Sequence, residues 1–308
     1  MRSKFIMLLL LGYMCSALAM PEDEVALKQD DTLGAEATQS ILTPLLLSPI
    51  SMIYDEQQQR PLFAKNVESV VPIASISKLM TAMVVLDARL PMDEHIRIRA
   101  QDMDTLKHTH SRLHPGMTLT RGELLKLALM SSENRAAAAL ARTYPGGFNT
   151  AVEMMNTKAR ELGMKDTRFL DPTGLSSGNV STAQDLVKMV LAAQAYEPIH
   201  KATTSSSHTV RPAGYRPLLY NNTNPLVRNA SWNIDVSKTG FINEAGRCIV
   251  MKANINHRSV VIVLLDSESK AMRAADADRI KGWMENSYDT GKSKQTVTTD
   301  AAIASTHL

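Results

Sequence analysis

The residues of this sequence best suited to chemistry are Ser75 and Lys78, at the start of an apolar stretch predicted to be helical. Residues three apart on a helix lie on one face, so the serine hydroxyl and the lysine amine can reach hydrogen-bonding distance. A serine is a poor nucleophile until a base takes its proton, and a neutral amine can be that base. Burial lowers a lysine pKa towards neutrality. The pair therefore indicates nucleophilic catalysis, although a lone Ser-x-x-Lys is more often an exposed helix start, and Ser267 and Lys270 repeat the spacing.

A polar break between two predicted helices supplies a second element, Ser132 and Asn134 on either side of Glu133. Such a turn can present a hydroxyl and a carboxamide to a cleft, although serine and asparagine are also typical of helix caps. A simple turn points Glu133 away from that cleft. The same Ser-x-Asn pattern recurs at 177–179 and 231–233. We prefer the copy at 132–134 because it falls between the other two elements in chain order.

The third element is Lys238-Thr239-Gly240, at the end of a predicted strand. The lysine offers a cation to a substrate carboxylate, and the threonine offers a hydroxyl beside it. The glycine allows backbone or substrate to approach closely. The alternative explanation is an edge strand that carries a protective lysine.

Each element alone is a weak signal, but the three in this order are specific. Ser-x-x-Lys, a Ser-x-Asn turn and Lys-Thr-Gly occur together in penicillin-binding proteins and class A β-lactamases. The sequence therefore resembles the penicilloyl-serine transferases, the β-lactamase-like superfamily, and within them the low-molecular-mass serine DD-peptidases, above all the D-alanyl-D-alanine endopeptidases. The segments that carry the resemblance are 72–83, 129–138, 171–175, 181–183 and 238–241, within a stretch from about Ser51 to Leu265.

The resemblance implies a catalytic role for four residues. Ser75 would be acylated by the penultimate D-alanine of a peptidoglycan peptide, with Lys78 as the general base. Ser132 and Asn134 would relay a proton and hold the substrate amide. β-Lactam antibiotics would acylate the same serine as covalent inhibitors, and the chemistry implied needs neither a metal nor a cofactor.

The resemblance also implies a substrate-binding strand. Lys238 and Thr239 would bind a carboxylate next to Gly240, and the backbone N–H groups of Ser75 and Phe241 would form an oxyanion hole. Both a terminal D-Ala-D-Ala and a D-alanyl–diaminopimelate cross-link carry a carboxylate on the carbon whose nitrogen leaves. The motifs therefore indicate the reaction, whereas the choice of the cross-link as substrate rests on the closer resemblance to endopeptidases.

Three alternatives to the endopeptidase interpretation remain at this stage. A class A β-lactamase would also carry an E-x-x-L-N deacylating segment, which the sequence lacks. Many D-Ala-D-Ala carboxypeptidases of the family carry a further β domain and an amphipathic anchor, and the short polar tail here leaves no room for them. A penicillin-binding sensor or scaffold that does not hydrolyse is disfavoured by the intact Lys78, Asn134 and Lys238.

The elements that must position these residues come from both ends of the chain. Ser51–Asp55 and Pro61–Lys65 resemble a hairpin, and three more strands are predicted near the C-terminus, at 234–241, 247–255 and 259–265. Predicted helices lie between them, one after a Thr120–Glu123 capping box, one capped by Ser181, and a last helix spans 271–288. The pattern predicts an α/β (α+β) fold of the β-lactamase/DD-peptidase type. One antiparallel sheet of about five strands is flanked by helices, with an inserted helical lobe at about 90–230.

The N-terminal segment predicts export. A basic start, a short apolar run and an Ala-x-Ala site indicate a signal peptide at 1–19, too short to cross a bilayer as a stable span. We expect a flexible leader at 20–46, a catalytic domain at 47–288 and a disordered tail at 289–308. The predicted location is the periplasm, as a soluble protein without a transmembrane anchor.

The composition excludes several classes of protein. The chain has 308 residues, of which 44% are hydrophobic and 21% charged, with a formal net charge of +3 and two cysteines. This profile fits a globular protein and argues against a nucleic-acid partner, which would favour a stronger basic excess. We expect Cys248 to be a buried, inert thiol. His108, His110 and His114 lack the spacing of a standard zinc site, so no metal is predicted.

Overall fold

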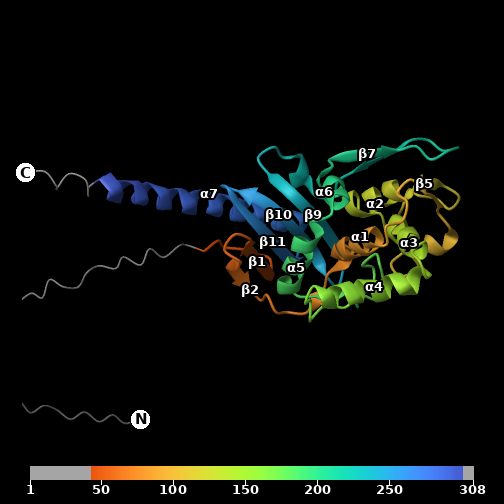
Figure 1. Cartoon of the computed structure of the whole chain (residues 1–308), viewed down its shortest axis with the longest axis horizontal. Helices are drawn as coiled ribbons and strands as arrows, with labels where there is room; N and C mark the ends of the chain where they lie inside the picture. The colour runs from red at the N-terminus through yellow and green to blue at the C-terminus, as the bar shows by residue number, and fades with distance from the viewer. Residues whose placement is uncertain (1–42, 301–308) are drawn as a thin grey trace, which may run out of the picture. The chain divides into compact units, whose positions relative to one another are not determined.

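A five-stranded sheet lies at the centre of the described part of the chain (Figure 1). The computed structural model describes residues 43–300, with side chains described for residues 43–286. The strand order is β2-β1-β11-β10-β9, and every neighbouring pair is antiparallel. The bounds are β1 (Ile50–Asp55), β2 (Arg60–Lys65), β9 (Asn233–Ile242), β10 (Gly246–Ile255) and β11 (Arg258–Ser267). The predicted fold class is confirmed, and the N-terminal hairpin joins the C-terminal strands through β1 and β11, with Ile50 opposite Leu265.

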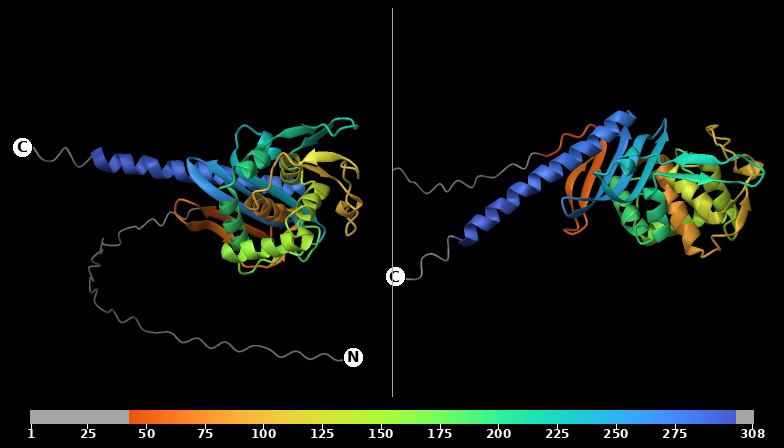
Figure 2. Two further views of the ribbon diagram at one scale, coloured as in Figure 1. Left: turned by 45° about the vertical axis from the view of Figure 1, so that its right-hand side comes forward. Right: turned by 90° about the horizontal axis from the view of Figure 1, so that it is seen from above.

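The sheet separates two apolar cores, because successive side chains of a strand point to opposite faces. Val250 and Val263 pack on the face covered by helices α1 and α5, whereas Met251 and Ile262 pack on the face covered by α7. The two views of Figure 2 show α7 on the side of the sheet opposite those two helices. The bounds are α1 (Lys78–Asp87), α5 (Ala183–Ala193) and α7 (Lys270–Asp300).

The chain between β2 and β9 supplies the remaining helices and three small sheets. Helix α1 runs through this block and packs against α2, α3 and α4 as well as α5. The helices are α2 (Arg121–Met130), α3 (Asn134–Arg142), α4 (Gly147–Glu161) and α6 (Glu197–Thr204), with 3-10 turns η1 (Ala74–Ser77), η2 (Ala100–Asp102) and η3 (Pro225–Arg228). The small sheets pair β3 (Val71–Pro72) with β6 (Val180–Ser181), β4 (His95–Arg97) with β5 (Thr118–Thr120), and β7 (Ser207–Val210) with β8 (Leu218–Asn221).

Local signals at the helix ends are right in one place and wrong in two. The capping box of α2 is present, since Thr120 Oγ1 accepts the Glu123 N–H at 3.1 Å. Ser181 instead lies in β6, and the next residue, Thr182, caps α5. Helix α7 continues to Asp300, whereas the sequence predicts its end at 288 and a disordered tail beyond. A proline would exclude a helix sterically, and residues 289–300 contain none.

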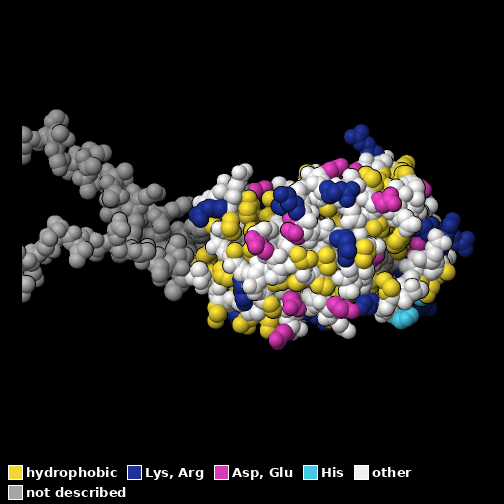
Figure 3. All heavy atoms as spheres, turned by 90° about the horizontal axis from the view of Figure 1, so that it is seen from below, with side chains coloured by type: hydrophobic (Ala, Val, Ile, Leu, Met, Phe, Trp, Pro, Cys, Tyr) yellow, Lys and Arg dark blue, Asp and Glu magenta, His cyan; other side chains and the backbone are white. Residues whose placement is uncertain are grey.

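The predicted signal peptide and most of the predicted leader lie outside the described residues, as do residues 301–308. Within the described part, no helix is both long and apolar enough to span a bilayer. On the face drawn in Figure 3, basic and acidic side chains are interspersed, without a continuous basic stripe. Such a mixed distribution is typical of a solvated protein surface.

Candidate active site

Ser75 and Lys78 meet where the 3-10 turn η1 passes into the buried helix α1. Lys78 is the first residue of α1, and only 1% of its surface is exposed. Its Nζ atom lies 2.8 Å from Ser75 Oγ, 2.7 Å from Asn134 Oδ1 and 2.6 Å from the carbonyl oxygen of Thr173. The predicted contact between the hydroxyl and the amine is therefore present, and two further oxygen atoms surround the same nitrogen.

Burial lowers the pKa of Lys78 to about 7, and the charges of Asp171, Glu133 and Asp104 only partly oppose that shift. A neutral amine has two hydrogens and one lone pair. The carbonyl oxygens of Asn134 and Thr173 can only accept hydrogen bonds, so they take both hydrogens. The lone pair then faces the Ser75 hydroxyl, and the amine can accept the proton of that hydroxyl.

The turn at 171–175 points the Thr173 carbonyl at the amine. The Asp171 carboxylate accepts N–H groups from Thr173 at 2.6 Å and from Gly174 at 2.8 Å. This segment is one of those that carry the family resemblance, and the structure shows that it supplies a hydrogen-bond acceptor for the lysine amine. Gly174 has a positive φ of 78°, and a Cβ atom there would lie 1.9 Å from the Ala74 carbonyl oxygen, next to Ser75.

Gly174→Ala is expected to disturb the fold and the nucleophile together. The added methyl group overlaps backbone, which cannot move aside as a flexible side chain can. We expect a fall in the melting temperature of about 5–10 °C and slower acylation by a fluorescent penicillin. Gly214→Ala is the matched control, because Gly214 has a φ of 79° and nothing within 4 Å of its Cβ position. Equal effects of the two substitutions would contradict the close packing at Gly174.

The break between α2 and α3 carries Ser132 and Asn134. Ser132 adopts the left-handed conformation, with φ 59°, and its Oγ atom accepts a hydrogen bond from Lys238 Nζ at 3.0 Å. Such a backbone conformation is costly for a non-glycine residue and is common at functional sites. Glu133 does not line the active-site cavity, in agreement with the prediction that it points away from the cleft. Its side chain is buried, accepts the Arg135 N–H at 3.3 Å as the cap of α3, and its charge acts on the pKa of Lys78.

A chain of hydrogen bonds that the sequence does not reveal fixes the Asn134 amide. Asn134 Nδ2 donates to Thr109 Oγ1 at 2.9 Å, and Thr109 Oγ1 in turn donates to Asp104 Oδ2 at 2.7 Å. Asp104 also accepts the N–H groups of Leu106, Lys107 and Thr109, which lower the pKa of its carboxyl despite partial burial. The loop that contains Asp104 and Thr109 thereby holds the Asn134 amide with its oxygen towards Lys78.

Thr109→Val tests this chain, because valine keeps the shape and removes the hydroxyl. The Asn134 amide then loses the bond that sets its orientation, and we expect the penicillin acylation rate to fall about tenfold, which corresponds to about 1.4 kcal/mol. Thr105→Val on the same loop is the control, since the Asn134 amide is hydrogen-bonded to Thr109 and Lys78 rather than to Thr105. An unchanged rate in Thr109→Val would show that the chain does not position the amide.

Strand β9 brings the third element beside the first two. Lys238 is 1% exposed, and its Nζ atom donates to Ser132 Oγ and to the Thr239 carbonyl at 2.8 Å. Burial, then repulsion from Lys78 and Arg273, lowers the pKa of Lys238 well below its usual value. A bound anion would favour its charged form. Gly240 allows the close approach that the sequence predicts, because a Cβ atom there would lie 2.8 Å from the Ile73 carbonyl oxygen.

A cavity of about 290 Å³ opens above these residues. Of the predicted site residues it exposes Ser75, Ser132, Asn134, Thr239, Gly240 and Phe241. Lys78 and Lys238 lie beneath it, joined to its floor by the hydrogen bonds above. Four further lining residues escape sequence reasoning: Thr223, Arg247, Lys270 and Arg273. Thr223 accepts a hydrogen bond from Thr239 Oγ1 at 2.7 Å, and Lys270 belongs to the second Ser-x-x-Lys copy.

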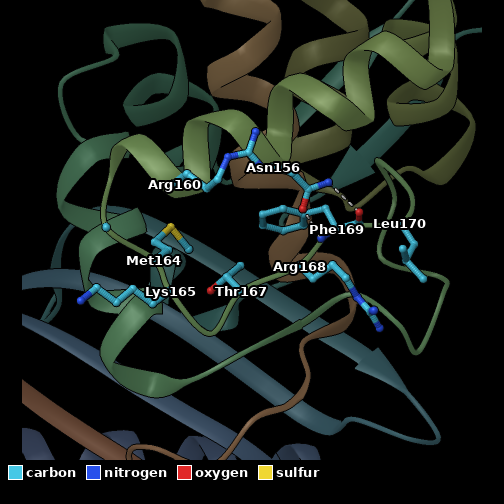
Figure 4. Close-up of a pocket in the computed structure, with 9 residues that line it drawn as sticks. Asn156, Arg160, Met164, Lys165, Thr167, Arg168, Phe169 and Leu170 are labelled. Carbon is cyan, nitrogen blue, oxygen red and sulfur yellow. Dashed lines mark hydrogen bonds between the residues drawn. The ribbon is translucent and has the colours of Figure 1, made fainter.

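Cavity size alone would not identify this site. A roomier cavity, of about 600 Å³, lies between the C-terminal part of α4 and the segment 164–170, and none of the predicted site residues lines it. In Figure 4 the Asn156 side chain points to Phe169, whose backbone it holds through bonds of 2.8 and 2.9 Å. This clamp anchors the chain shortly before Asp171, so the second cavity lies beside the support of the site.

The residues that line the active-site cavity include neither a cysteine nor a histidine. Cys248 is completely buried in β10, as predicted, and burial raises the pKa of its thiol to about 11. In the part of the chain described by the structure, no group of three or more His, Cys, Asp or Glu side chains is arranged to hold a metal ion.

Comparison with known proteins agrees with the serine chemistry that the site geometry indicates. Residues 40–269 match the peptidase S11 family, described as D-alanyl-D-alanine carboxypeptidase, so the chain belongs to this family of serine DD-peptidases, which are hydrolases. It is 47% identical to a D-alanyl-D-alanine endopeptidase of Pseudomonas aeruginosa over 80% of this chain and 79% of that protein. It is 45% identical to the endopeptidase of Escherichia coli over 81% and 79%. The resemblance to endopeptidases of the penicillin-binding protein 7 type is confirmed.

A solved structure gives the same assignment for the fold. The Streptomyces K15 DD-transpeptidase superposes with a TM-score of 0.73 at 26% identity, over 78% of this chain and 98% of that one. A D-alanyl-D-alanine carboxypeptidase of Mycobacterium tuberculosis superposes with a TM-score of 0.69 over 78% and 91%. The sheet with its surrounding helices is therefore the DD-peptidase fold.

Proposed function

We propose that the chain is a D-alanyl-D-alanine endopeptidase that hydrolyses D-alanyl–diaminopimelate cross-links in peptidoglycan through an acyl-enzyme on Ser75. The observation that supports this reaction is the position of the Lys78 amine. It is buried and held by two carbonyl oxygens, with its lone pair towards Ser75 Oγ. The choice of the cross-link is supported by the identity of 45–47% to two proteins named endopeptidases.

Acylation in this proposal begins with transfer of the Ser75 proton to neutral Lys78. Ser75 Oγ bonds to the D-alanyl carbonyl carbon, and the backbone N–H groups of Ser75 and Phe241 stabilise the oxyanion. The C–N bond then breaks, and the proton that Lys78 took from Ser75 passes through the Ser132 hydroxyl to the leaving nitrogen, so Lys78 is neutral again; the Ser132 hydroxyl accepts a hydrogen bond from Lys238. Asn134 holds the substrate amide. The products are the acyl-enzyme and a free amine.

Deacylation uses the same groups in the opposite order. A water molecule gives a proton to Lys78 and attacks the ester carbonyl carbon. The ester C–O bond breaks, and Ser75 Oγ recovers its proton from the lysine. Lys238 and Thr239, next to Gly240, bind the carboxylate beside the scissile bond during the first half of the cycle. A β-lactam carries a carboxylate too, so it would occupy the same groups and leave a slowly hydrolysed ester on Ser75.

The cellular setting follows from the substrate. We place the protein in the periplasm, after removal of the signal peptide predicted at 1–19. The bacterial relatives named D-alanyl-D-alanine endopeptidase support this location. The proposal includes no nucleic-acid partner and no membrane anchor.

Digestion of purified cross-linked muropeptide dimers tests the proposed function. Wild-type protein is expected to yield monomers, detected by mass spectrometry. Release of free D-alanine from a pentapeptide, without dimer cleavage, would identify a carboxypeptidase instead. A stable penicillin adduct without either product would identify a sensor or scaffold.

A further inference from the structure

Three of the residues that line the active-site cavity are cations that the sequence motifs do not include. Arg247 comes from β10, Lys270 is the first residue of α7, and Arg273 lies three residues further along α7. The residues that line this cavity include no Asp or Glu. An incoming ligand therefore meets positive charge that no acidic side chain of the cavity wall neutralises.

Two of these cations are held by groups other than carboxylates. Arg247 lies over the Phe241 ring, with its Cζ atom 3.3 Å from the ring centroid, and that ring is 44% exposed at the cavity. Arg273 is buried and donates to the Cys248 carbonyl at 2.9 Å. Among the described side chains, no carboxylate lies within 4 Å of Arg247, Lys270 or Arg273. By contrast, Lys107, in the loop between η2 and β5, is paired with Glu244.

The active-site cavity has more cationic side chains than a D-alanine leaving group needs. D-alanine has one carboxylate, and Lys238 with Thr239 can bind it, with Arg273 close enough to depress the charge on Lys238. Arg247 and Lys270 then have no anion to bind. A cross-linked substrate is different, because its leaving strand departs with its own peptide, whose C-terminal carboxylate is a second anion.

We infer that Arg247 and Lys270 form a second carboxylate subsite, which binds the C-terminal carboxylate of the leaving peptide strand. This inference rests on the proposed function and deepens it, since the subsite gives the enzyme a reason to prefer a cross-link to a terminal D-Ala-D-Ala. The Phe241 ring keeps the Arg247 guanidinium in place before substrate arrives, which reduces the ordering cost of binding.

The test compares two dimers that differ only at that carboxylate, one with the free acid and one with its amide. Wild-type protein is expected to favour the free acid by about tenfold in kcat/KM, mostly through KM, a preference that corresponds to about 1.4 kcal/mol. Arg247→Gln and Lys270→Gln should each reduce that preference, and the double variant should abolish it. Arg247→Lys should retain part of it. Arg60→Gln is the matched control, because it removes an exposed charge from β2, at the opposite edge of the sheet.

The outcomes separate the subsite from the function beneath it. Equal cleavage of both dimers by wild type, or a full preference in the double variant, would overturn the subsite and leave the endopeptidase function intact. Cleavage of neither dimer, by a protein that still forms a penicillin adduct, would overturn the proposed function and the subsite with it.

Discussion

Ser75→Ala is expected to lower the rate of dimer cleavage at least about 10⁴-fold and to abolish the covalent penicillin adduct. Without the hydroxyl no acyl-enzyme can form, whereas the remaining groups can still bind substrate. The fold should persist, because among the described residues Ser75 Oγ is hydrogen-bonded only to Lys78 and, at 3.4 Å, to the Thr173 carbonyl oxygen. Rates from product analysis, adduct formation by gel fluorescence and thermal melting measure the three effects.

The matched control for that variant is Ser131→Ala. The Ser131 hydroxyl donates to the Leu127 carbonyl at 2.8 Å and does not line the cavity, so this variant removes the same atom from a neighbouring part of the molecule. It should retain labelling and cleavage. Persistent labelling of Ser75→Ala would show that another residue is the nucleophile.

Lys78 predicts the pH dependence of acylation. The neutral amine is the active form, and burial sets its pKa to about 7. Protonation increases as pH falls below that value, so the second-order rate constant for penicillin acylation should fall about tenfold per pH unit on the acid side and level off above it. Lys78→Arg should lose this dependence and about 10³–10⁴-fold in rate, because a guanidinium stays protonated.

Glu133→Gln provides a second readout of the same group. The Glu133 charge raises the pKa of Lys78, and glutamine can still accept the Arg135 N–H that the carboxylate accepts now. The variant should therefore shift the acid limb to lower pH while it keeps the plateau rate. If the acid limb of the pH profile stayed in place in both Glu133→Gln and Lys78→Arg, Lys78 would be excluded as the base. A wild-type acylation rate that is flat between about pH 5 and 8 would exclude it as well.

The fold was predictable because its main signals are local. Alternation and apolar runs mark β9, β10 and β11, and the spacing of Ser75 and Lys78 places both groups on one face. Chain order was enough to choose Ser132 over the other Ser-x-Asn copies. In one of them Asn179 is buried and bonded to the backbone N–H groups of Leu170 and Asp171, so its role is structural.

The remaining site residues could not be predicted because each acts through a contact distant in sequence. Thr173 reaches Lys78 across 95 positions, and Thr109 reaches Asn134 across 25. Nothing in the local pattern of either threonine distinguishes it from a turn residue. Arg273 looks like any other charged residue near the start of a helix until packing buries it beside β10. The hairpin β7–β8 was missed for a similar reason, since its polar residues lack a clear alternation.

The central claim is that Ser75 carries the peptide during cleavage of a cross-link. The most direct measurement is an acid quench of wild-type protein during turnover of the muropeptide dimer, followed by mass-spectrometric mapping of the acyl group. We predict a peptide containing Ser75 whose mass is increased by the donor strand ending in its D-alanyl carbonyl. Monomer products that accumulate while Ser75 stays unmodified and another residue carries the acyl group would contradict the account.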